Sequence, residues 1–310
     1  QYFCSVPSQT LPNRDFVHAA TSNGYVNNKP DILVPAKTIY NQIQDAIDDG
    51  RTDLSWKIYS GTQKSETGTW EPFSLTRLCM KQIQDKQFDP NFKLMDAFYA
   101  DAKSGKLPSY AFLEPQFSGP LQNDQHPPAD IRPGEKLIAD IYNALVNSPN
   151  WAETLFVITY DAHGGCYDHF PPTATAKTPD SVSENGQFGF RFNRFGVRVP
   201  TVVVSPLIEA GTIGRPAGWT PFDHTSIIKT VQNCFGLKGN LTERDKAAPD
   251  LSCLLSLKRP RTDKPTVRPQ KFPKASAAGP NDLHRLCAEV IVEITGLAAP
   301  DDESMHNFLL

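Results

Sequence analysis

The most informative part of this chain is the stretch Thr154-Leu-Phe-Val-Ile-Thr-Tyr-Asp-Ala-His-Gly-Gly-Cys-Tyr-Asp-His-Phe-Pro-Pro172. Its apolar and β-branched run, from Leu155 to Tyr160, predicts a buried parallel strand. The run stops abruptly, and four ionisable residues then follow around two glycines: Asp161, His163, Asp168 and His169. Because ligands bind beyond the carboxyl ends of strands in open α/β sheets, the stretch predicts a metal or phosphate site. The alternative is a loop of solvated polar residues with a glycine turn.

Strands and helices alternate along the rest of the chain. Apolar runs predict strands over residues 55–59, 110–114 and 197–205, the last interrupted by a proline. Helical spacing of apolar residues predicts helices over residues 39–49, 92–102, 133–147, 225–235 and 282–296. Residues 1–30, rich in Pro, Asn, Ser and Gly, are expected to be irregular. The alternation predicts an α/β fold whose mainly parallel sheet carries helices on both faces.

Length and charge narrow the class of protein. At 310 residues, the chain is long enough to bury one large core. Its net charge of −3 argues against nucleic acid as the main partner. No apolar run approaches the roughly 20 residues of a transmembrane helix. The start, Gln1-Tyr-Phe-Cys4, lacks the pattern of a signal peptide, and because it does not begin with Met we expect a processed or trimmed chain.

Two features favour a secreted protein. The six cysteines form an even set, compatible with up to three disulfides, and contain no CxxC pair that would indicate structural zinc. The sequence Asn240-Leu-Thr242 is a glycosylation sequon. Together they predict an oxidising, extracellular setting, with disulfide bonds and a glycan as the corresponding expectations.

The composition of the chain changes near residue 257. From Leu257 to Ala278 the residues Lys, Arg, Pro and Ser predominate, which is typical of an extended tether. The helical pattern then resumes over residues 282–296. We therefore expect one domain over residues 1–256. Residues 257–310 are expected to form a basic, Pro-rich tether and a C-terminal helix that packs back on the domain.

Three further clusters contain residues that can do chemistry. Thr21-Ser-Asn-Gly24 offers a hydroxyl nucleophile on a tight bend, although a helix cap or an Asx-turn explains the same residues. In Asn123-Asp-Gln-His-Pro-Pro128, His126 is placed to bind an anion or is simply solvated. In Phe222-Asp-His-Thr-Ser226, the aspartate can cap the next helix and His224 can meet phosphate at that helix N-terminus. A plain N-cap is the alternative there.

Several long motifs occur in one order along the chain. They are Pro12-Asn-Arg14, Ala20-Thr-Ser22, Asn123-Asp-Gln-His-Pro127, Thr159-Tyr-Asp-Ala-His-Gly-Gly-Cys-Tyr-Asp-His-Phe-Pro-Pro172, Gly189-Phe-Arg-Phe-Asn-Arg-Phe-Gly-Val-Arg-Val-Pro200, Ser205-Pro-Leu-Ile-Glu-Ala-Gly211 and Phe222-Asp-His-Thr-Ser226. In this order they resemble the phosphoesterase family of non-specific and bacterial phospholipases C and related acid phosphatases. The resemblance runs from about the first residue to about Gly236. It implies an alkaline-phosphatase-like, three-layer α/β fold with a mostly parallel central sheet.

The resemblance also implies a mechanism. Thr21 would be the nucleophile that attacks phosphorus, and Asp161 a ligand of a divalent metal ion that also contacts the Thr21 hydroxyl. His126 would bind phosphate or act as a general acid, with His224 lying close by. The motif that contains Asp161 contributes two more phosphate-binding candidates, His163 and His169.

Two departures from the family pattern bear on activity. Ala162 stands where the family usually has an acidic metal ligand, and the loss of that carboxylate weakens metal binding. The family also supplies a Glu-Asn pair to the metal from a motif of the type Glu-Asn-Arg-Ser-Phe-Asp-His, which this chain lacks. We therefore expect an N-terminally incomplete domain. It would be a fragment, a trimmed product, or a chain completed by a second polypeptide.

Two functions remain open at this point. The first is a secreted, metal-dependent phosphoesterase that acts on a phospholipid headgroup or a small phosphate ester. The second is a non-catalytic relative that binds a phosphorylated ligand or a partner, and Ala162 and the missing metal pair support it. A structural protein without any site would leave the ordered motifs unexplained.

Overall fold

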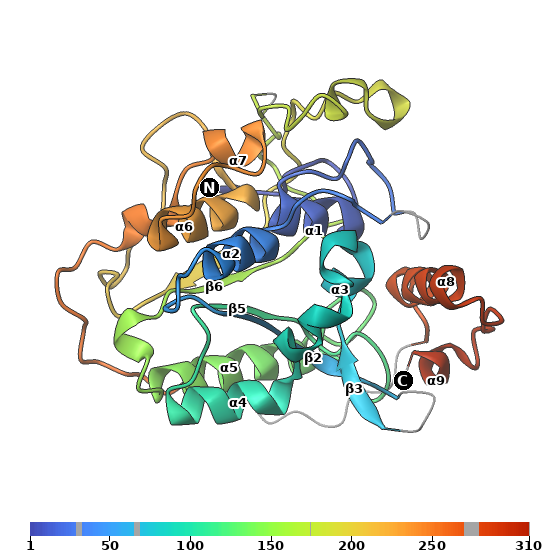
Figure 1. The fold of residues 1–310 in the computed structure, drawn as a ribbon, viewed down its shortest axis with the longest axis horizontal. Coiled ribbons are helices and arrows are strands. Elements are labelled where there is room, and N and C mark those ends of the chain that lie inside the picture. Colours follow the sequence, from blue (N-terminus) through green and yellow to red (C-terminus); the bar gives the residue numbers. More distant parts are fainter. Residues whose placement is uncertain (29–32, 65–68, 174, 270–278, 310) are drawn as a thin grey trace.

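The computed structural model describes residues 1–28, 33–64, 69–173, 175–269 and 279–309. Within these residues the strands form three separate sheets, and helices lie on both sides of them (Figure 1). The three sheets are small, so side-chain contacts rather than one continuous ladder connect them.

The largest sheet is built on β2 (Trp56–Lys64). Two of its neighbours, β4 (Phe92–Leu94) and β5 (Tyr110–Leu113), run parallel to it. The third, β3 (Trp70–Phe73), runs antiparallel. The predicted strands at 55–59 and 110–114 are therefore confirmed as β2 and β5.

Two two-stranded ladders complete the described strands. The strand β1 (Tyr2–Phe3) is parallel to β8 (Phe222–Asp223). The strand β6 (Phe156–Thr159) is antiparallel to β7 (Thr201–Val204). The mixed α/β class is confirmed, but the described residues do not form one mostly parallel central sheet. The alkaline-phosphatase-like arrangement stays a prediction.

The strand predicted after Leu155 forms, but the prediction of a buried parallel strand is wrong. All four residues of β6 are half-buried, and the described partner strand is the antiparallel β7. An antiparallel neighbour needs no crossover helix, and only short 3-10 turns are described between β6 and β7. The strand predicted over residues 197–205 is shortened because Pro200 has no N–H to give to a ladder, so β7 begins after it.

Most of the predicted helices are confirmed. They are α2 (Ile39–Asp48), α4 (Met95–Ser104), α5 (Arg132–Val146), α6 (Thr225–Phe235) and α8 (Asp282–Thr295). The described chain also contains α1 (Thr10–Ala19), α3 (Leu75–Cys79), α7 (Glu243–Ala247) and α9 (Met305–Phe308). Its 3-10 turns are η1 (Lys81–Ile83), η2 (Lys86–Asn91), η3 (Trp151–Glu153), η4 (Ser183–Asn185), η5 (Gln187–Gly189) and η6 (Leu251–Leu254). None of the described helices is long and apolar enough to cross a membrane.

One local prediction is wrong, and the start of one confirmed helix is shifted. The irregular structure expected at the N-terminus is not found over residues 1–28, because these residues contain β1 and α1. Nine of the ten residues of α1 are buried, so the helix has no solvated face to give its sequence an amphipathic period. The helix predicted over residues 92–102 starts three residues late, because Phe92–Leu94 pair with β2 as β4.

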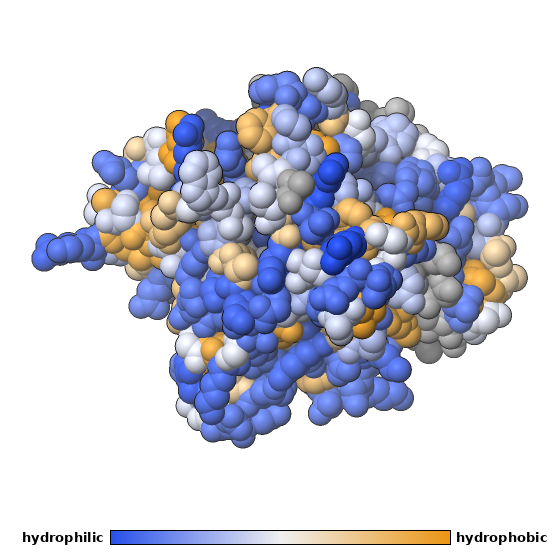
Figure 2. Space-filling model, turned by 90° about the horizontal axis from the view of Figure 1, so that it is seen from above, coloured by the Kyte–Doolittle hydropathy of each residue, from blue (hydrophilic) through white to orange (hydrophobic). Residues whose placement is uncertain are grey.

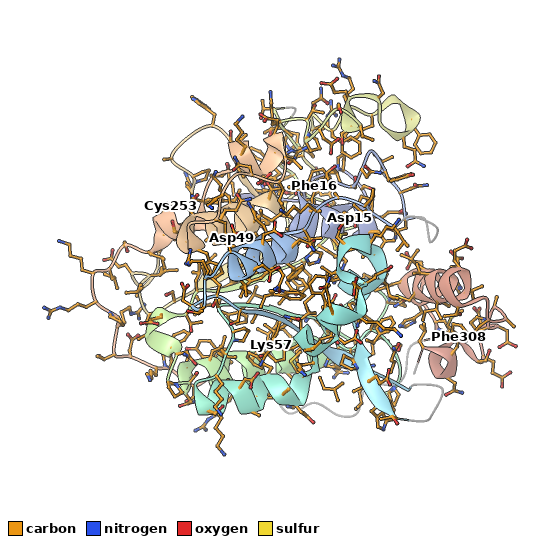
Figure 3. The ribbon with its side chains drawn as sticks, in the orientation of Figure 1. Asp15, Phe16, Asp49, Lys57, Cys253 and Phe308 are labelled. Atoms are coloured by element: carbon orange, nitrogen blue, oxygen red, sulfur yellow. The ribbon has the colours of Figure 1, made fainter. Side chains whose placement is uncertain are left out.

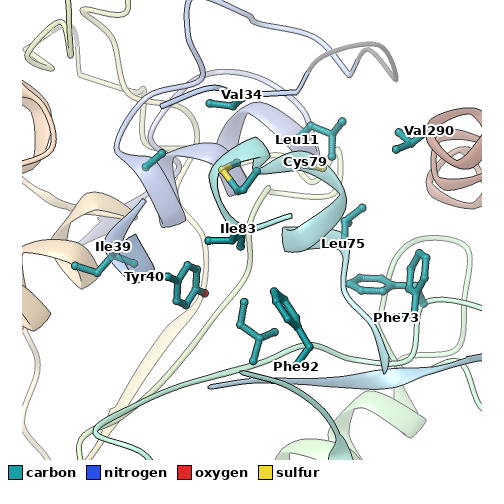
Figure 4. Close-up of a cluster of buried hydrophobic side chains, with 14 of the residues drawn as sticks. Leu11, Val34, Ile39, Tyr40, Phe73, Leu75, Cys79, Ile83, Phe92 and Val290 are labelled. Atoms are coloured by element: carbon teal, nitrogen blue, oxygen red, sulfur yellow. The ribbon is translucent and has the colours of Figure 1, made fainter. Parts of the chain in front are cut away.

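The largest apolar core lies between α2, α3 and the sheet of β2. Tyr40, Trp56 and Phe92 are buried in it, and Figure 4 shows Tyr40 and Phe92 among its side chains. Burying a large apolar side chain contributes about 1.5–3 kcal/mol, so this cluster is a main source of stability. Leu286 and Val290 of α8 belong to the same cluster, and the C-terminal helix therefore packs on the body of the protein.

The basic segment that precedes α8 is extended where the structure describes it. Residues 257–269 contain no helix or strand. The Val267 amide donates to Oδ1 of Asn143 on α5 at 3.1 Å, which ties the segment to the surface. Residues 270–278 of the predicted tether lie outside the described residues, and the division of the chain into domains stays a prediction.

The predicted disulfides are not found. All six cysteines are free thiols: Cys4, Cys79 and Cys287 are buried, and Cys166, Cys234 and Cys253 are exposed. A disulfide needs two Cβ atoms about 4 Å apart, which an even number of cysteines alone does not provide. Cys4 lies in a different apolar cluster from Cys79 and Cys287, and Cys253 lies at the opposite edge of the molecule from α8 (Figure 3).

Asp15 of α1 is a carboxyl group buried without full hydrogen bonding (Figure 3). It is 3% exposed, and its Oδ1 has no partner among the described residues. Burial raises the pKa of Asp15 well above its usual range, and the nearby Arg14 charge only partly opposes this. The folded protein therefore holds the carboxyl in its neutral form, because an unpaired buried carboxylate is strongly disfavoured.

We expect Asp15 to make the protein less stable as the pH rises. Its pKa is higher in the folded chain than in the unfolded one, so the folded state is penalised progressively above the unfolded pKa of about 4. Asp15→Asn keeps the shape and cannot ionise. It should be about 1–3 kcal/mol more stable than the parent at about pH 8, and nearly equal at about pH 4. Urea unfolding at both pH values measures the difference, and a pH-independent difference contradicts the assignment.

Candidate functional site

The polar centre of the molecule is built around Arg14 of α1. Its side chain is 11% exposed and forms an ion pair with the fully buried Glu114, the residue that follows β5. On the other side, Arg14 Nη1 lies 3.9 Å from Oδ2 of Asp161, just after β6. The carboxyl ends of strands from two separate sheets therefore meet at one cation. Arg14 Nε is buried and has no partner among the described residues.

A chain of hydrogen bonds continues from Glu114 back into α1. Thr76 of α3 donates to Glu114 Oε1 from its amide at 3.1 Å and from its hydroxyl at 2.9 Å. Because that hydroxyl proton is used, His18 Nε2 must be the donor across the 3.0 Å contact to Thr76 Oγ1. His18 Nδ1 then accepts from the Tyr40 hydroxyl at 3.2 Å. Burial, reinforced by the charge of Arg14, holds the pKa of His18 well below its usual range, so the imidazole is neutral.

His224 lies directly behind the candidate ligand Asp161. It precedes α6, is fully buried, and its Nε2 lies 2.8 Å from the main-chain oxygen of Asp161. A carbonyl can only accept, so Nε2 carries the proton and Nδ1 faces the Tyr2 hydroxyl at 3.5 Å. Burial lowers the pKa of His224, which keeps the ring neutral. The structure thus uses the exchangeable proton of His224 to hold the end of β6.

His126 belongs to the loop after β5 and lies beside the start of the C-terminal helix. Its Nδ1 is 2.8 Å from the carbonyl oxygen of Pro127, and its Nε2 is 3.7 Å from Asp282 at the start of α8. Asp124 accepts from the His126 amide at 3.4 Å, and burial raises the pKa of Asp124 to about 6. Within the described chain, no hydrogen bond or ion pair connects His126 with Arg14.

Asp168 and the two remaining candidate histidines belong to the loop after β6. Arg198 donates to both Asp168 oxygens at 2.7 Å, and that guanidinium keeps the pKa of Asp168 well below its usual range. The side chain of His169 is 83% exposed and lies 3.6 Å from Asp168. His163 is half-buried. Asp168 therefore serves to hold the loop, and phosphate binding by the two histidines stays a prediction.

Thr21 lies just beyond the C-terminal end of α1, and its hydroxyl is already engaged. The residue is 3% exposed, and Oγ1 donates to Asp180 at 2.6 Å and accepts from the Asn23 amide at 3.1 Å. The contacts described for Thr21 do not include Arg14 or Asp161. Its role as nucleophile stays a prediction.

Sequence reasoning missed the face of α1 that meets the polar centre. Arg14 and His18 are four residues apart, so they lie on the same face of the helix. Thr10, the first residue of α1, lies one turn before Arg14 on this face and is 8% exposed. The spacing of these three polar residues is a signal that the sequence contains. Glu114, at the end of a predicted strand, is a second one.

The described residues do not provide a complete metal site. Nowhere among them do three or more His, Cys, Asp or Glu side chains converge as metal ligands. Oδ1 of Asp161 accepts from the amide of Ala162 at 2.7 Å, and Ala162 itself has no ligating side chain. The Arg14 charge beside Asp161 also disfavours a second cation there. One carboxylate is too few for tight binding of a divalent ion.

Comparison with known proteins defines the class to which this fold and site belong. The model of the family described as "Phosphoesterase family" matches residues 1–238. The chain therefore belongs to the phosphoesterase family, as the ordered motifs predict.

Three relatives show how far the similarity extends. Non-specific phospholipase C3 of Arabidopsis thaliana is 37% identical over 288 residues, which cover 89% of this chain and 51% of the relative. Non-specific phospholipase C1 of the same plant is 38% identical over 313 residues, or 96% of this chain and 55% of the relative. Phospholipase C B of Mycobacterium tuberculosis is 27% identical over 310 residues, or 90% and 57%. The chain spans about half the length of the curated relatives it matches.

We expect the Arg14–Glu114 pair to be the costliest polar contact to break. Glu114→Gln leaves the buried guanidinium uncompensated and should lower the free energy of unfolding by about 3–5 kcal/mol. The double variant Arg14→Met with Glu114→Leu replaces the pair by apolar groups of similar size and should recover most of that loss. Urea unfolding of the three proteins measures the loss and its recovery, and a double variant no more stable than Glu114→Gln contradicts a buried pair. Lys136→Gln, at an exposed ion pair of α5, is the control and should change little.

Proposed function

We propose that this chain is a hydrolase of phosphate esters, of the phospholipase C or acid phosphatase type. Family membership supports the class of reaction. The observation that carries the proposal is Arg14, a permanent cation beyond β5 and β6 whose buried Nε has no described partner. Guanidinium groups match the geometry of phosphate oxygens and offset their charge during phosphoryl transfer.

The proposed nucleophile is a threonine hydroxyl. Thr21 is the residue predicted from the family resemblance, whereas the register of α1 brings Thr10 within one turn of Arg14. In either case the hydroxyl oxygen forms a bond to phosphorus, and the bond to the leaving alcohol breaks as that alcohol takes up a proton. Water then hydrolyses the threonyl phosphoester and regenerates the hydroxyl. Asp180 already accepts the Thr21 proton and is the base available to that candidate.

The four candidate histidines have different roles in the proposal. His126 is the proposed general acid or phosphate-binding group, since the one ion pair described for its Nε2 is with the exposed Asp282. His163 and His169 are proposed phosphate contacts on the loop after β6. His224 is neutral and bonded to the Asp161 carbonyl, which supports a positioning role for it.

A divalent metal ion is a further part of the proposal. Asp161, with Thr21, would hold it, and the ion would supply charge neutralisation at the phosphoryl group. The described side chains offer too few ligands for this ion. We therefore propose that a second polypeptide supplies the missing metal ligands. Dependence of hydrolysis on added metal tests both ideas together.

The proposed substrate is a phospholipid headgroup or a small phosphate ester, and the proposed setting is extracellular. The relatives named phospholipases C support the substrate class. The exposed side chain of Asn240 supports glycosylation at its sequon, and a mass shift on deglycosylation of secreted protein checks it. The free cysteines lend the extracellular setting no support.

A second function is a phosphoesterase scaffold that binds a phosphorylated ligand or a partner without turnover. Ala162 and the absence of a complete ligand set among the described residues favour it. Under this alternative the chain binds inorganic phosphate through Arg14 but hydrolyses nothing.

Hydrolysis of p-nitrophenyl phosphate and p-nitrophenylphosphorylcholine, with and without divalent metals, tests the first function. Replacing the true nucleophile, in Thr21→Val or Thr10→Val, should lower kcat by about a thousandfold or more, while the other variant stays within about tenfold of the parent. Each threonine variant is therefore the control for the other. Full turnover in both variants contradicts a threonine nucleophile.

Restoring a carboxylate separates the two functions. If the site is catalytic but short of ligands, Ala162→Glu should tighten metal activation by about tenfold or more. Ala162→Gln is the matched control, because it adds the same bulk without the charge. Phosphate binding by calorimetry with no hydrolysis in the parent and in Ala162→Glu supports the scaffold.

A further inference from the structure

Two segments at one edge of the molecule form a single surface, which we call the strap surface: residues 206–219 and residues 257–268. The amide of Leu257 donates to the carbonyl of Leu207 at 3.0 Å, and the amide of Arg261 to that of Pro206 at 2.8 Å. Residues 257–268 form the orange-red trace at the left edge of Figure 1. The segment is therefore laid on the protein in a defined place rather than free in solvent.

The strap surface is strongly basic, although the whole chain has a net charge of −3. Its basic residues are Arg215, Lys258, Arg259, Arg261, Lys264 and Arg268, against the acidic residues Glu209 and Asp263. Arg261 is neutralised locally by an ion pair with Asp263. The other five cations are exposed, and none of them forms an ion pair within the described chain. Six basic against two acidic residues leave this surface with a net charge of +4.

Apolar side chains lie beside these charges. Trp219 is 102% exposed and Ile213 is 81% exposed, and Val267 on the strap is 45% exposed. At the left end of Figure 2, apolar side chains gather next to a protruding hydrophilic segment, on a face that is otherwise mainly hydrophilic. Leaving a tryptophan and an isoleucine fully in water forfeits the burial that stabilises other large apolar side chains. Exposed apolar side chains gathered in this way are typical of a surface that binds another molecule.

We propose that the strap surface binds anionic lipid membranes. Tryptophan is enriched at the headgroup level of membranes, where its ring is apolar and its N–H is hydrated. Clusters of four to eight Lys and Arg residues attract anionic lipids, and the five free cations of the strap surface fall in this range. Charge and exposed aromatic surface together match a lipid interface better than a neutral protein partner.

The strap surface lies away from the Arg14 centre. Val204, the last residue of β7, pairs with Phe156 at the start of β6, whereas Asp161 follows the other end of β6. Residues 206–219 therefore leave the sheet at the edge opposite to Asp161. The segment then turns back towards the N-terminus, where the Gln1 amino group donates to the Gly214 carbonyl at 3.3 Å. The inference does not rest on the proposed function, because none of the residues of the strap surface belongs to the Arg14 centre.

Co-sedimentation of the 310-residue chain with vesicles tests the inference. Vesicles of phosphatidylcholine with about one third phosphatidylserine should bind the protein, and vesicles of phosphatidylcholine alone should bind it at least about tenfold more weakly. Binding should weaken as salt is added, because exposed charges are screened. Equal binding to both vesicles, or none to either, overturns the proposal.

Variants locate the contact on the molecule. Neutralising Lys258, Arg259, Lys264 and Arg268 to Gln should lower partition into anionic vesicles by at least about tenfold. The matched control neutralises four exposed lysines elsewhere: Lys81, Lys86, Lys103 and Lys177. A loss in the control as large as in the strap variant assigns the binding to overall charge and rejects the strap surface. All eight side chains are exposed, so both variants should unfold at the parent's temperature.

Fluorescence of Trp219 provides a readout that charge alone does not move. Trp56 and Trp151 are buried, Trp70 is 49% exposed and Trp219 is 102% exposed, so the blue shift on adding anionic vesicles should come mainly from Trp219, and Trp219→Ser separates its contribution from that of Trp70. Trp219→Ser should abolish the shift and weaken partition severalfold. An unchanged shift in Trp219→Ser contradicts insertion at this place. Capture of acidic proteins by the strap with no vesicle binding assigns the surface to a protein partner and also rejects the proposal.

Discussion

The burial of one guanidinium group constrains most of the polar interior. Arg14 cannot give up its charge, so acceptors must surround it once α1 is packed inside the protein. Glu114, at the end of β5, provides the main counter-charge, and Asp161, after β6, lies on the other side. The position of α1 is thereby coupled to two strand ends that share no described backbone ladder. The same coupling orders Thr76 and His18 and leaves His18 neutral.

A second buried guanidinium group, that of Arg244, stabilises the region of the β1–β8 ladder. Arg244 donates to the carbonyl oxygens of Ser5 and Phe192 and lies 3.5 Å from Asp223 of β8. Burial lowers the pKa of Arg244 to about 10, and Asp223 partly opposes that shift. The three small sheets are thus connected by charged side chains and by apolar packing. Interior variants at either arginine should therefore affect the whole molecule rather than one loop.

Helices with a solvated face could be predicted from the sequence, and α6 has the predicted bounds, residues 225–235. Its apolar period and its Gly236 C-cap are local features, so no distant contact is needed to find it. The helix α1 could not be found in this way, because burial on nearly all sides removes the period. Disulfides were also beyond local reasoning, since a count of cysteines carries no distance between them.

The candidate site shows the same division. By itself the sequence determined the family, through long motifs in a fixed order, and it determined that Asp161 follows a strand. Only the tertiary structure decided that Arg14 pairs with Glu114, 100 positions away along the chain, and that Thr21 bonds to Asp180 while Thr10 shares a face with Arg14. Motifs record which residue types a chemistry needs. Which of them meet is decided by packing, because burial makes every charge and hydroxyl find its partner among groups that only the fold brings near.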